Sequence, residues 1–189
     1  MESTYDRLVS AAIKLMIEKS YAGTSIGMLA EEVGISKSTV IHYFKSKEGI
    51  LLAILENFFP VAIKELRTVV NNKSISGTEK LRRFLYFQMK LVAESGDVLT
   101  LVIRETRYLG EEHRKIYNQR HREYEGLVVK IIEQIQTEET SLFKNKDKNL
   151  VMKAIFGMCN YTTIWYRPEG PLRIDEIADQ FFDILSCNV

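Results

Sequence analysis

The chain has 189 residues, of which 46% are hydrophobic and 27% are charged. Its 26 Lys and Arg residues nearly balance 25 Asp and Glu residues, which gives a formal net charge of +1 at pH 7. Such a chain can bury one sizeable core or two small ones, but it carries no global basic field. No apolar run approaches the roughly 20 residues of a membrane-spanning helix, and the polar N-terminus lacks a secretory signal. We therefore expect a soluble, cytoplasmic protein.

Two helices are predicted at the N-terminal end. The first covers residues 4–19, and the segment Tyr21-Ala-Gly23 ends it. The second begins after Thr24 and Ser25, whose hydroxyls can cap it, and its apolar residues repeat at i, i+3, i+4 and i+7. These apolar residues are Ile26, Leu29, Ala30 and Val33.

A third, short helix is predicted directly after a tight reversal of the chain. Gly34 tolerates the left-handed backbone of a helix C-cap, and Ser36 is a good N-cap for the helix that follows. At about 100° per residue the apolar and polar residues of this helix separate onto opposite faces. The apolar pair is Val40 and Phe44, and the polar pair is Ser38 and His42. A small polar face that points outward is typical of the recognition helix of a helix-turn-helix, which reads the major groove of DNA.

The charges of this region are balanced in number but separated in position. Residues 1–50 contain six basic and six acidic side chains. The basic residues near the third helix are Lys37, Lys45 and Lys47, whereas Glu31 and Glu32 lie on the helix before it. A local patch of this kind can hold DNA phosphates, and the resulting binding is salt-dependent.

Several motifs in the first 55 residues resemble the N-terminal signature of TetR-type transcriptional regulators. The motifs are Arg7-Leu-Val-Ser-Ala-Ala12, Tyr21-Ala-Gly-Thr-Ser25, Leu29-Ala30, Val33-Gly34-Ile35-Ser36, His42-Tyr-Phe44 and Ser46-Lys-Glu48. The resemblance implies a homodimeric, all-helical DNA-binding repressor whose larger C-terminal domain binds a small effector. One position departs from the family, because Ile41 stands where an aromatic residue, most often Tyr, is usual. A hydroxyl that could touch DNA is therefore missing there.

The DNA-binding residues are expected on the polar face, at the caps and among the flanking cations of the helix-turn-helix. Contacts at or near base edges are assigned to Lys37, Ser38, Thr39 and His42. Phosphate contacts are assigned to Thr24, Tyr43 and Lys47, and the cap residues Ser25 and Ser36 complete the set.

The chain beyond this region is predicted to be helical throughout. A long helix over residues 47–70 contains Pro60, which removes one backbone hydrogen bond, so we expect a bend there but not an end. After a loop at 71–77, further helical segments are predicted at 78–94, 97–109, 111–136, 146–166 and 173–186. No segment alternates as a half-buried strand does. The predicted fold is all-α with about nine helices, with a helix-turn-helix DNA-binding domain over residues 1–47 and an effector-binding and dimerisation domain over residues 48–189.

Polar residues interrupt the apolar stripes of the middle helices at Gln88, Glu105, Arg120 and His121. Because a buried charge is costly unless it is paired, these residues indicate either an internal ion pair, favoured for Glu105 with Arg120, or a cavity with converging polar groups. The candidate effector-binding residues are Phe84, Gln88, Arg104, Tyr108, Arg120, Tyr124, Phe156 and Asn160, with Arg107 as a further partner for a charged end.

A second resemblance lies in the last 25 residues. The segments Trp165-Tyr-Arg-Pro-Glu-Gly-Pro-Leu172 and Asp175-Glu-Ile-Ala-Asp-Gln-Phe181 are similar to TetR-type regulators of lipid and steroid catabolism, several of which respond to CoA thioesters. An amphipathic stripe follows the proline-containing turn and comprises Ile174, Ile177, Ala178, Phe181, Phe182 and Leu185. With the apolar face of residues 150–166 this stripe can form a four-helix dimer interface, or it can close the core of the monomer.

The sequence thus predicts a transcriptional regulator, a repressor that binds an inverted-repeat operator as a homodimer. A small hydrophobic effector is expected to release it, and the second resemblance implies a fatty acyl-CoA. The alternative is a multidrug-type sensor-repressor of an efflux gene, with an aromatic pocket that admits cations. No nucleophile and base are spaced for catalysis, and a structural nucleoid protein needs a larger basic stripe. His113 and His121 lack a two-ligand helical spacing, so we expect no metal. We also expect no cofactor and no membrane partner.

Overall fold

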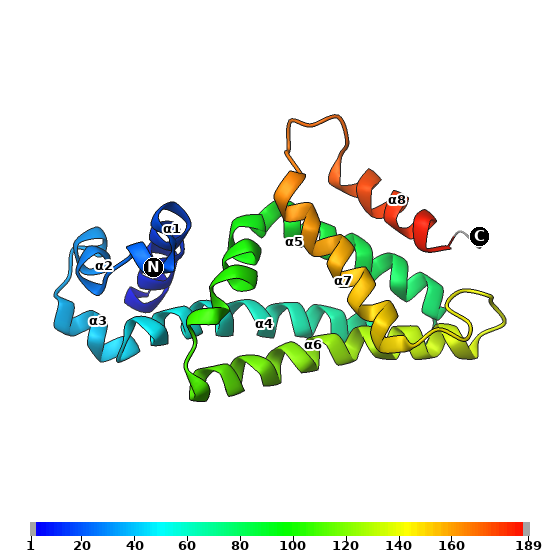
Figure 1. Cartoon of the computed structure of the whole chain (residues 1–189), viewed down its shortest axis with the longest axis horizontal. Helices are drawn as coiled ribbons and strands as arrows, with labels where there is room; N and C mark the ends of the chain where they lie inside the picture. The colour runs from blue at the N-terminus through cyan, green and yellow to red at the C-terminus, as the bar shows by residue number, and fades with distance from the viewer. Residues whose placement is uncertain (1–2, 187–189) are drawn as a thin grey trace. The chain divides into compact units, whose positions relative to one another are not determined.

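The computed structural model describes residues 3–186, and all the regular structure in that range is helical (Figure 1). Eight α-helices and one short 3-10 helix follow one another along the chain. Their bounds are α1 Thr4–Gly23, α2 Ile26–Val33, α3 Lys37–Phe44, α4 Lys47–Asn71, α5 Gly77–Glu105, η1 Thr106–Tyr108, α6 Glu111–Thr137, α7 Lys148–Trp165 and α8 Ile174–Ser186. The predicted all-α fold class is therefore confirmed.

The described residues divide into two compact units. The first unit contains the residues up to Pro60 together with Thr100–Arg120, and the second contains Val61–Leu99 and the residues from His121 onward. The division falls within α4, α5 and α6, so each of these helices contributes to both units. The predicted domain boundary after residue 47 stays a prediction.

The three N-terminal helices enclose a small core within the first unit. Leu8 and Ala12 of α1, Leu29 of α2 and Val40 of α3 are each at most 1% exposed. The regular part of α1 stops where the sequence predicted, because Ser20 has a left-handed φ of 61° and separates the last turn from the rest. Figure 1 shows α1, α2 and α3 as three consecutive helices at the N-terminal end of the chain.

Two long helices differ in how they pass the residues expected to disturb them. The helix α4 continues through Pro60, as predicted. The predicted segments 78–94 and 97–109 meet at a kink inside α5, where Ser95 leaves helical geometry with φ −142° and ψ 28°. The second segment ends at Glu105, earlier than predicted. This junction explains why eight α-helices form where about nine were predicted.

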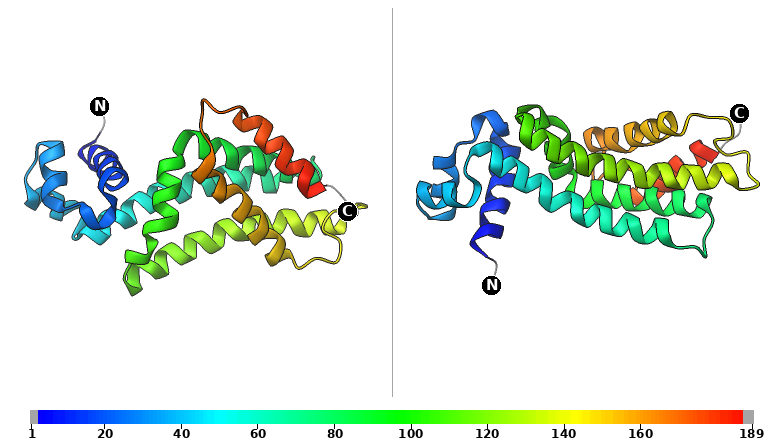
Figure 2. Two further views of the ribbon diagram at one scale, coloured as in Figure 1. Left: turned by 45° about the horizontal axis from the view of Figure 1, so that its top comes forward. Right: turned by 90° about the horizontal axis from the view of Figure 1, so that it is seen from below.

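The second unit is a bundle whose neighbouring helices make close contacts, and Figure 2 shows them side by side. Arg67 of α4 pairs with Glu123 of α6. Gly77 starts α5 against α6, where an added Cβ would lie 2.8 Å from the backbone nitrogen of Ile135. Only glycine fits this approach, and its N–H donates to Glu138 Oε1 at 2.7 Å. Within residues 3–186 no helix combines the length and apolar character needed to cross a membrane.

The stripe of α8 is largely used inside the protomer. Ile177, Ala178 and Phe182 are at most 8% exposed. The guanidinium carbon of Arg82 lies 4.0 Å from the centre of the Phe182 ring. These three residues therefore close the core of the second unit, which was the alternative to a role in a dimer interface. Ile184, in the last turn of the helix, is 63% exposed.

The core of the second unit contains one hydrogen bond between two neutral polar side chains. The Tyr124 hydroxyl donates to Gln88 Oε1 at 2.8 Å, and both residues are at most 5% exposed. The ring of Phe156 packs 5.6 Å from that of Tyr124 and 5.7 Å from that of Phe84. Burial raises the pKa of Tyr124, so the hydroxyl keeps the proton that it donates. Gln88 therefore interrupts an apolar stripe in the sequence, but its side-chain oxygen accepts a hydrogen bond in the fold.

We predict that Tyr124→Phe lowers the free energy of unfolding by about 1–3 kcal/mol, because Gln88 Oε1 would stay buried without its donor. Urea unfolding followed by circular dichroism at one protein concentration measures this. Tyr86→Phe is the matched control, since Tyr86 is 55% exposed, and should change stability by less than about 0.5 kcal/mol. The double variant Gln88→Leu, Tyr124→Phe should recover part of the loss. Equal stability of Tyr124→Phe and the control would contradict this prediction.

Candidate functional site

The turn between α2 and α3 is held by the caps that the sequence predicted. Ser25 Oγ accepts the N–H of Met28 at 3.2 Å, and Ser36 Oγ accepts the N–H of Thr39 at 3.1 Å. Gly34 has a left-handed φ of 73° and its N–H closes the end of α2. Each of these bonds satisfies a backbone group that a helix end leaves without an intrahelical partner. The predicted helix-turn-helix is therefore fixed by local hydrogen bonds.

The α3 helix separates its faces as expected. Val40 and Phe44 are 0% and 6% exposed and pack into the first unit. The outward residues are Lys37, Ser38, Ile41, His42 and Tyr43, and Thr39 is half-buried. The Ser36 hydroxyl lies 2.7 Å from that of Ser38 and 2.8 Å from that of Thr39, so the start of the helix presents a compact group of hydroxyls. Such a face can approach base edges closely.

The three lysines around α3 have different surroundings. Lys37 extends along α2, where an added Cβ on Gly27 would lie 2.8 Å from Lys37 Cε. Lys45 Nζ donates to the carbonyl of His42 at 3.2 Å. Lys47 Nζ donates to the carbonyl of Ala22 at 3.2 Å, and partial burial lowers its pKa. All three side chains can turn toward phosphate, but Lys47 is already engaged by the end of α1.

The structure gives Thr24 a role that conflicts with the predicted phosphate contact. Its side chain is only 4% exposed, and its hydroxyl donates to the carbonyl of Ser20 at 2.9 Å. Sequence reasoning offered both Thr24 and Ser25 as caps of α2. Ser25 is the N-cap of that helix, whereas Thr24 ends α1. Tyr43 is 42% exposed, and its ring centre lies 6.4 Å from that of Tyr5.

Glu48, in the first turn of α4, joins the helix-turn-helix to a distant segment within the first unit. Its Oε1 accepts the N–H of Gly110 at 2.6 Å and lies 2.8 Å from His113 Nδ1. A Cβ on Gly110 would lie 3.2 Å from the same oxygen, so glycine permits this approach. Sequence reasoning missed this joint, because its partners are 62 and 65 residues away and no local pattern marks them.

A stack of side chains lies beside this joint. The rings of Tyr21 and Tyr108 are 4.6 Å apart at 23°, and Lys47 Nζ lies 4.4 Å from the centre of the Tyr21 ring. Arg107 covers the other ring at 5.0 Å. The end of α1, the start of α4 and the segment before α6 therefore contact one another around Tyr21 and Tyr108.

The structure brings together some of the predicted effector-binding residues. Those in the second unit are Phe84, Gln88, Tyr124, Phe156 and Asn160, and those in the first are Arg104, Tyr108 and Arg120. Phe84, Gln88 and Tyr124 fill the core of the second unit. Arg104 and Tyr108 are exposed, and Arg120 is half-buried.

Among the described residues, Glu105 Oε2 has no hydrogen-bond partner, so the ion pair favoured for Glu105 with Arg120 does not engage this oxygen. Glu105 is 7% exposed, and its Oε2 is fully buried. A buried carboxylate oxygen without a donor is costly, so this group is a natural partner for a donor supplied from outside the chain. No cluster of three or more His, Cys, Asp or Glu side chains suited to a metal occurs within residues 3–186.

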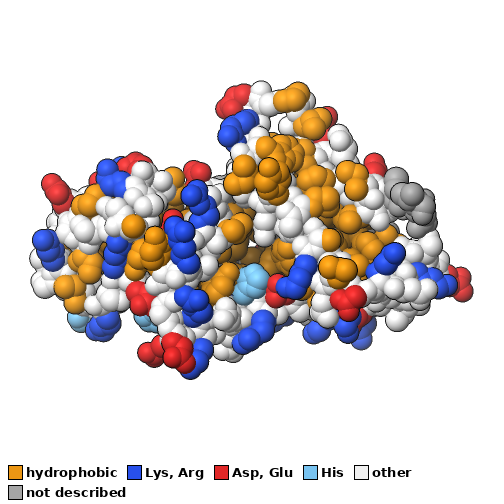
Figure 3. Space-filling model, in the orientation of Figure 1, with side chains coloured by type: hydrophobic (Ala, Val, Ile, Leu, Met, Phe, Trp, Pro, Cys, Tyr) orange, Lys and Arg blue, Asp and Glu red, His pale blue; other side chains and the backbone are white. Residues whose placement is uncertain are grey.

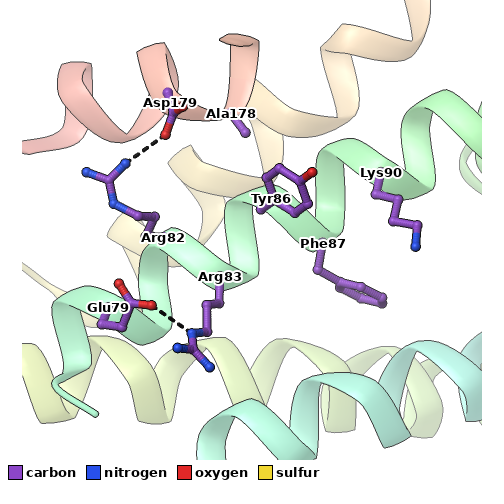
Figure 4. Close-up of a pocket in the computed structure, with 8 residues that line it drawn as sticks. All are labelled: Glu79, Arg82, Arg83, Tyr86, Phe87, Lys90, Ala178 and Asp179. Carbon is purple, nitrogen blue, oxygen red and sulfur yellow. Dashed lines mark hydrogen bonds and ion pairs between the residues drawn. The ribbon is translucent and has the colours of Figure 1, made fainter. Parts of the chain in front are cut away.

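A groove of about 470 Å³ lies between α5 and α8 (Figure 4). None of its lining residues was among the predicted effector-binding residues; they are Glu79, Arg82, Arg83, Tyr86, Phe87, Lys90, Ala178 and Asp179. Arg82 reaches Asp179 at 2.7 Å, and Arg83 reaches Glu79 at 2.7 Å on the side away from α8. Carboxylates already neutralise both guanidinium groups, so the groove has no strong preference for an anion.

Comparisons with known proteins agree with this geometry. Residues 8–54 match the family model described as bacterial regulatory proteins, tetR family, and residues 74–187 match a tetracyclin repressor-like C-terminal domain.

Solved structures of similar proteins cover nearly the whole chain. PfmR from Thermus thermophilus is 28% identical with a TM-score of 0.84, over 96% of this chain and 97% of PfmR. FadR from Bacillus subtilis, solved in complex with stearoyl-CoA, is 22% identical with a TM-score of 0.81, over 98% and 100% of the two chains. AibR, solved with isovaleryl coenzyme A and operator DNA, is 22% identical with a TM-score of 0.86, over 97% and 98%. At 22% identity these last two show likeness of fold.

We predict that Ser36→Ala loosens α3, because the amide of Thr39 loses its acceptor at a cost of about 1 kcal/mol. Hydrogen exchange of peptides that cover α3 should become about fivefold faster. Ser38→Ala is the matched control, since this exposed hydroxyl does not cap the helix, and should leave exchange nearly unchanged. Identical exchange in the two variants would show that the cap does not hold this helix.

Proposed function

The chain belongs to the TetR family of bacterial transcriptional regulators, and on that premise we propose that it is a repressor. It binds an inverted-repeat operator as a homodimer in the cytoplasm and leaves the DNA when it binds a fatty acyl-CoA. The observation that carries this proposal is the capped α3 helix, with Val40 and Phe44 buried and its polar residues turned outward. Membership of this family also supports a regulator over an enzyme.

The proposed DNA contacts follow from the exposed face of α3. Two recognition helices of a dimer enter major grooves about 34–36 Å apart. Lys37, Ser38, Thr39 and His42 are the side chains proposed at or near base edges. Tyr43 and Lys47 are proposed at phosphates together with the caps Ser25 and Ser36, whereas Thr24 is left out because its hydroxyl is bonded internally.

The homodimer proposal is supported by an apolar stripe on α7. Leu150, Tyr161 and Ile164 are 67%, 65% and 54% exposed. Ala154 and Gly157 are exposed between them, so the stripe repeats at spacings of four and three residues. Such a stripe suits a second helix, and its small residues permit close approach. Figure 3 shows hydrophobic side chains gathered over α7 on this face.

The acyl-CoA proposal is supported by relatives with bound ligands. FadR was solved with stearoyl-CoA and AibR with isovaleryl coenzyme A. In this chain an acyl group would enter the apolar region of Phe84, Tyr124 and Phe156. Arg104, Arg107 and Arg120 stay the predicted partners of a charged end. Binding would move α4 through Glu48 and its partners, with a coupling free energy of about 1–3 kcal/mol.

One observation favours a second candidate, a sensor of cationic compounds. The buried Oε2 of Glu105 has no donor among the described residues. An amphipathic cation with an N–H donor could supply one, and the two candidates differ in the charge of the effector.

We predict that the protein binds DNA from upstream of its own gene and that affinity falls steeply with salt. Fluorescence anisotropy with a labelled fragment measures this. The double variant Lys37→Ala, His42→Ala should bind at least about tenfold more weakly, because it loses contacts on the reading face. Lys144→Ala, an exposed lysine of the connector between α6 and α7, is the control and should bind normally. Normal binding by the double variant would contradict the assignment of α3 as the recognition helix.

We predict that stearoyl-CoA releases the bound fragment in the same assay, whereas free CoA and stearate do so weakly. If a primary-amine cation such as dodecylamine releases the fragment instead, and Glu105→Gln abolishes that effect, the cationic candidate replaces the acyl-CoA. Release by neither class would reject both effectors and keep the DNA-binding proposal.

We predict that Gly157→Arg converts the dimer to a monomer in sedimentation velocity, because an Arg side chain would fill the stripe on α7. Nothing lies within 4 Å of a Cβ added at Gly157, and Arg is the better helix former, so the substitution should not unfold the protomer. Val61→Arg, at a site that is 61% exposed on α4, is the control and should stay dimeric. A dimeric Gly157→Arg variant would place the interface elsewhere.

A further inference from the structure

One large apolar side chain stands exposed on the reading face of α3. Ile41 is 46% exposed, whereas the other aliphatic and Phe residues of this helix, Val40 and Phe44, are at most 6% exposed. Ile41 precedes Lys45 by one helical turn and follows Lys37 by one, so it lies between two cations in a region expected to meet DNA.

The neighbours of Ile41 are directed away from it. Lys37 lies along α2 over Gly27, and Lys45 Nζ turns back to the carbonyl of His42. Neither alkyl stem is therefore placed as a cover for the isoleucine. Tyr43, the other exposed apolar residue of α3, differs because rings of Tyr5 and Phe44 lie within 6.4 Å of it.

The major groove offers few apolar groups to such a side chain. The base edges there carry hydrogen-bond donors and acceptors, and the C5-methyl group of thymine is the apolar exception. An isoleucine lacks a polar atom in its side chain, so it cannot read a donor or an acceptor. We propose that Ile41 contacts a thymine methyl group in each operator half-site and makes this chain prefer thymine there. This inference rests on the proposed function and adds a specificity-determining residue to it.

The size of the preference follows from the area of one methyl group. Burying a methyl against an aliphatic side chain is worth about a fourfold change in affinity per contact. A homodimer makes the contact twice, so removal of both methyl groups should weaken binding by more than about tenfold.

Deoxyuridine scanning tests the proposal, because uracil differs from thymine at this edge only by the missing C5-methyl group. The probe is a duplex selected from a random pool by the purified protein. Each thymine of the half-site is replaced in turn, and dissociation constants are measured for the wild type, Ile41→Ala and Ile17→Ala. Ile17 is the matched control, since it is 42% exposed on α1.

The expected result is one or two positions at which the wild type and Ile17→Ala lose about fourfold per half-site, while Ile41→Ala loses less than about twofold. Wild-type binding that is insensitive to deoxyuridine at every position overturns the proposal, and so does an Ile41→Ala variant that keeps the full loss. Both of these outcomes leave the DNA-binding function intact. If no duplex is selected at all, the proposed function fails and this inference fails with it.

Discussion

The shared carboxylate oxygen of Glu48 joins the helix-turn-helix to the start of α6, and the proposed control of DNA binding would act through this contact. The helix-turn-helix ends four residues earlier, and the same side chain accepts the N–H of Gly110 and lies beside His113. The helix-turn-helix is therefore attached to the start of α6 by these contacts and by the stacked rings of Tyr21 and Tyr108. A movement of that segment would change the contacts that Glu48, in the first turn of α4, makes with Gly110 and His113. Hydrogen bonds to an ionised carboxylate are stronger than neutral ones, which suits a joint that must transmit a displacement.

The helix-turn-helix could be predicted from sequence because its determinants are local. Gly34 and Ser36 act on backbone groups within four residues, and Val40 and Phe44 are buried as helical periodicity requires. Caps alone do not identify a contact, however. Thr24 and Ser25 are adjacent hydroxyl residues with equal sequence signals, yet one is buried against Ser20 and the other caps α2. The difference arises from the left-handed Ser20, whose conformation no composition pattern indicated.

The effector domain was less predictable because its decisive contacts join distant residues. Sequence periodicity identified Gln88 as out of pattern, but its partner Tyr124 lies 36 residues away on another helix. The same reasoning paired Glu105 with Arg120 because both interrupted apolar stripes, and the fold leaves Glu105 Oε2 without a donor among the described residues. Periodicity shows which face a residue occupies, whereas the rotation and approach of two helices decide which polar groups meet. The break predicted between the segments 78–94 and 97–109 is present, because Ser95 leaves helical geometry and α5 is kinked there.

A filled core has a consequence for any effector that enters the second unit. Phe84 is 0% exposed and Gln88 is 2% exposed, with the Tyr124 hydroxyl bonded to the amide oxygen. An acyl chain that enters here must separate these side chains, so it binds a conformation that differs from the described one. A ligand shifts an equilibrium between two states only by the difference in its affinity for them. A closed core makes this difference large, because the ligand can enter only the opened state. The packing of this core would thus couple the entry of an acyl chain, if the proposed effector is correct, to a change of conformation in the second unit.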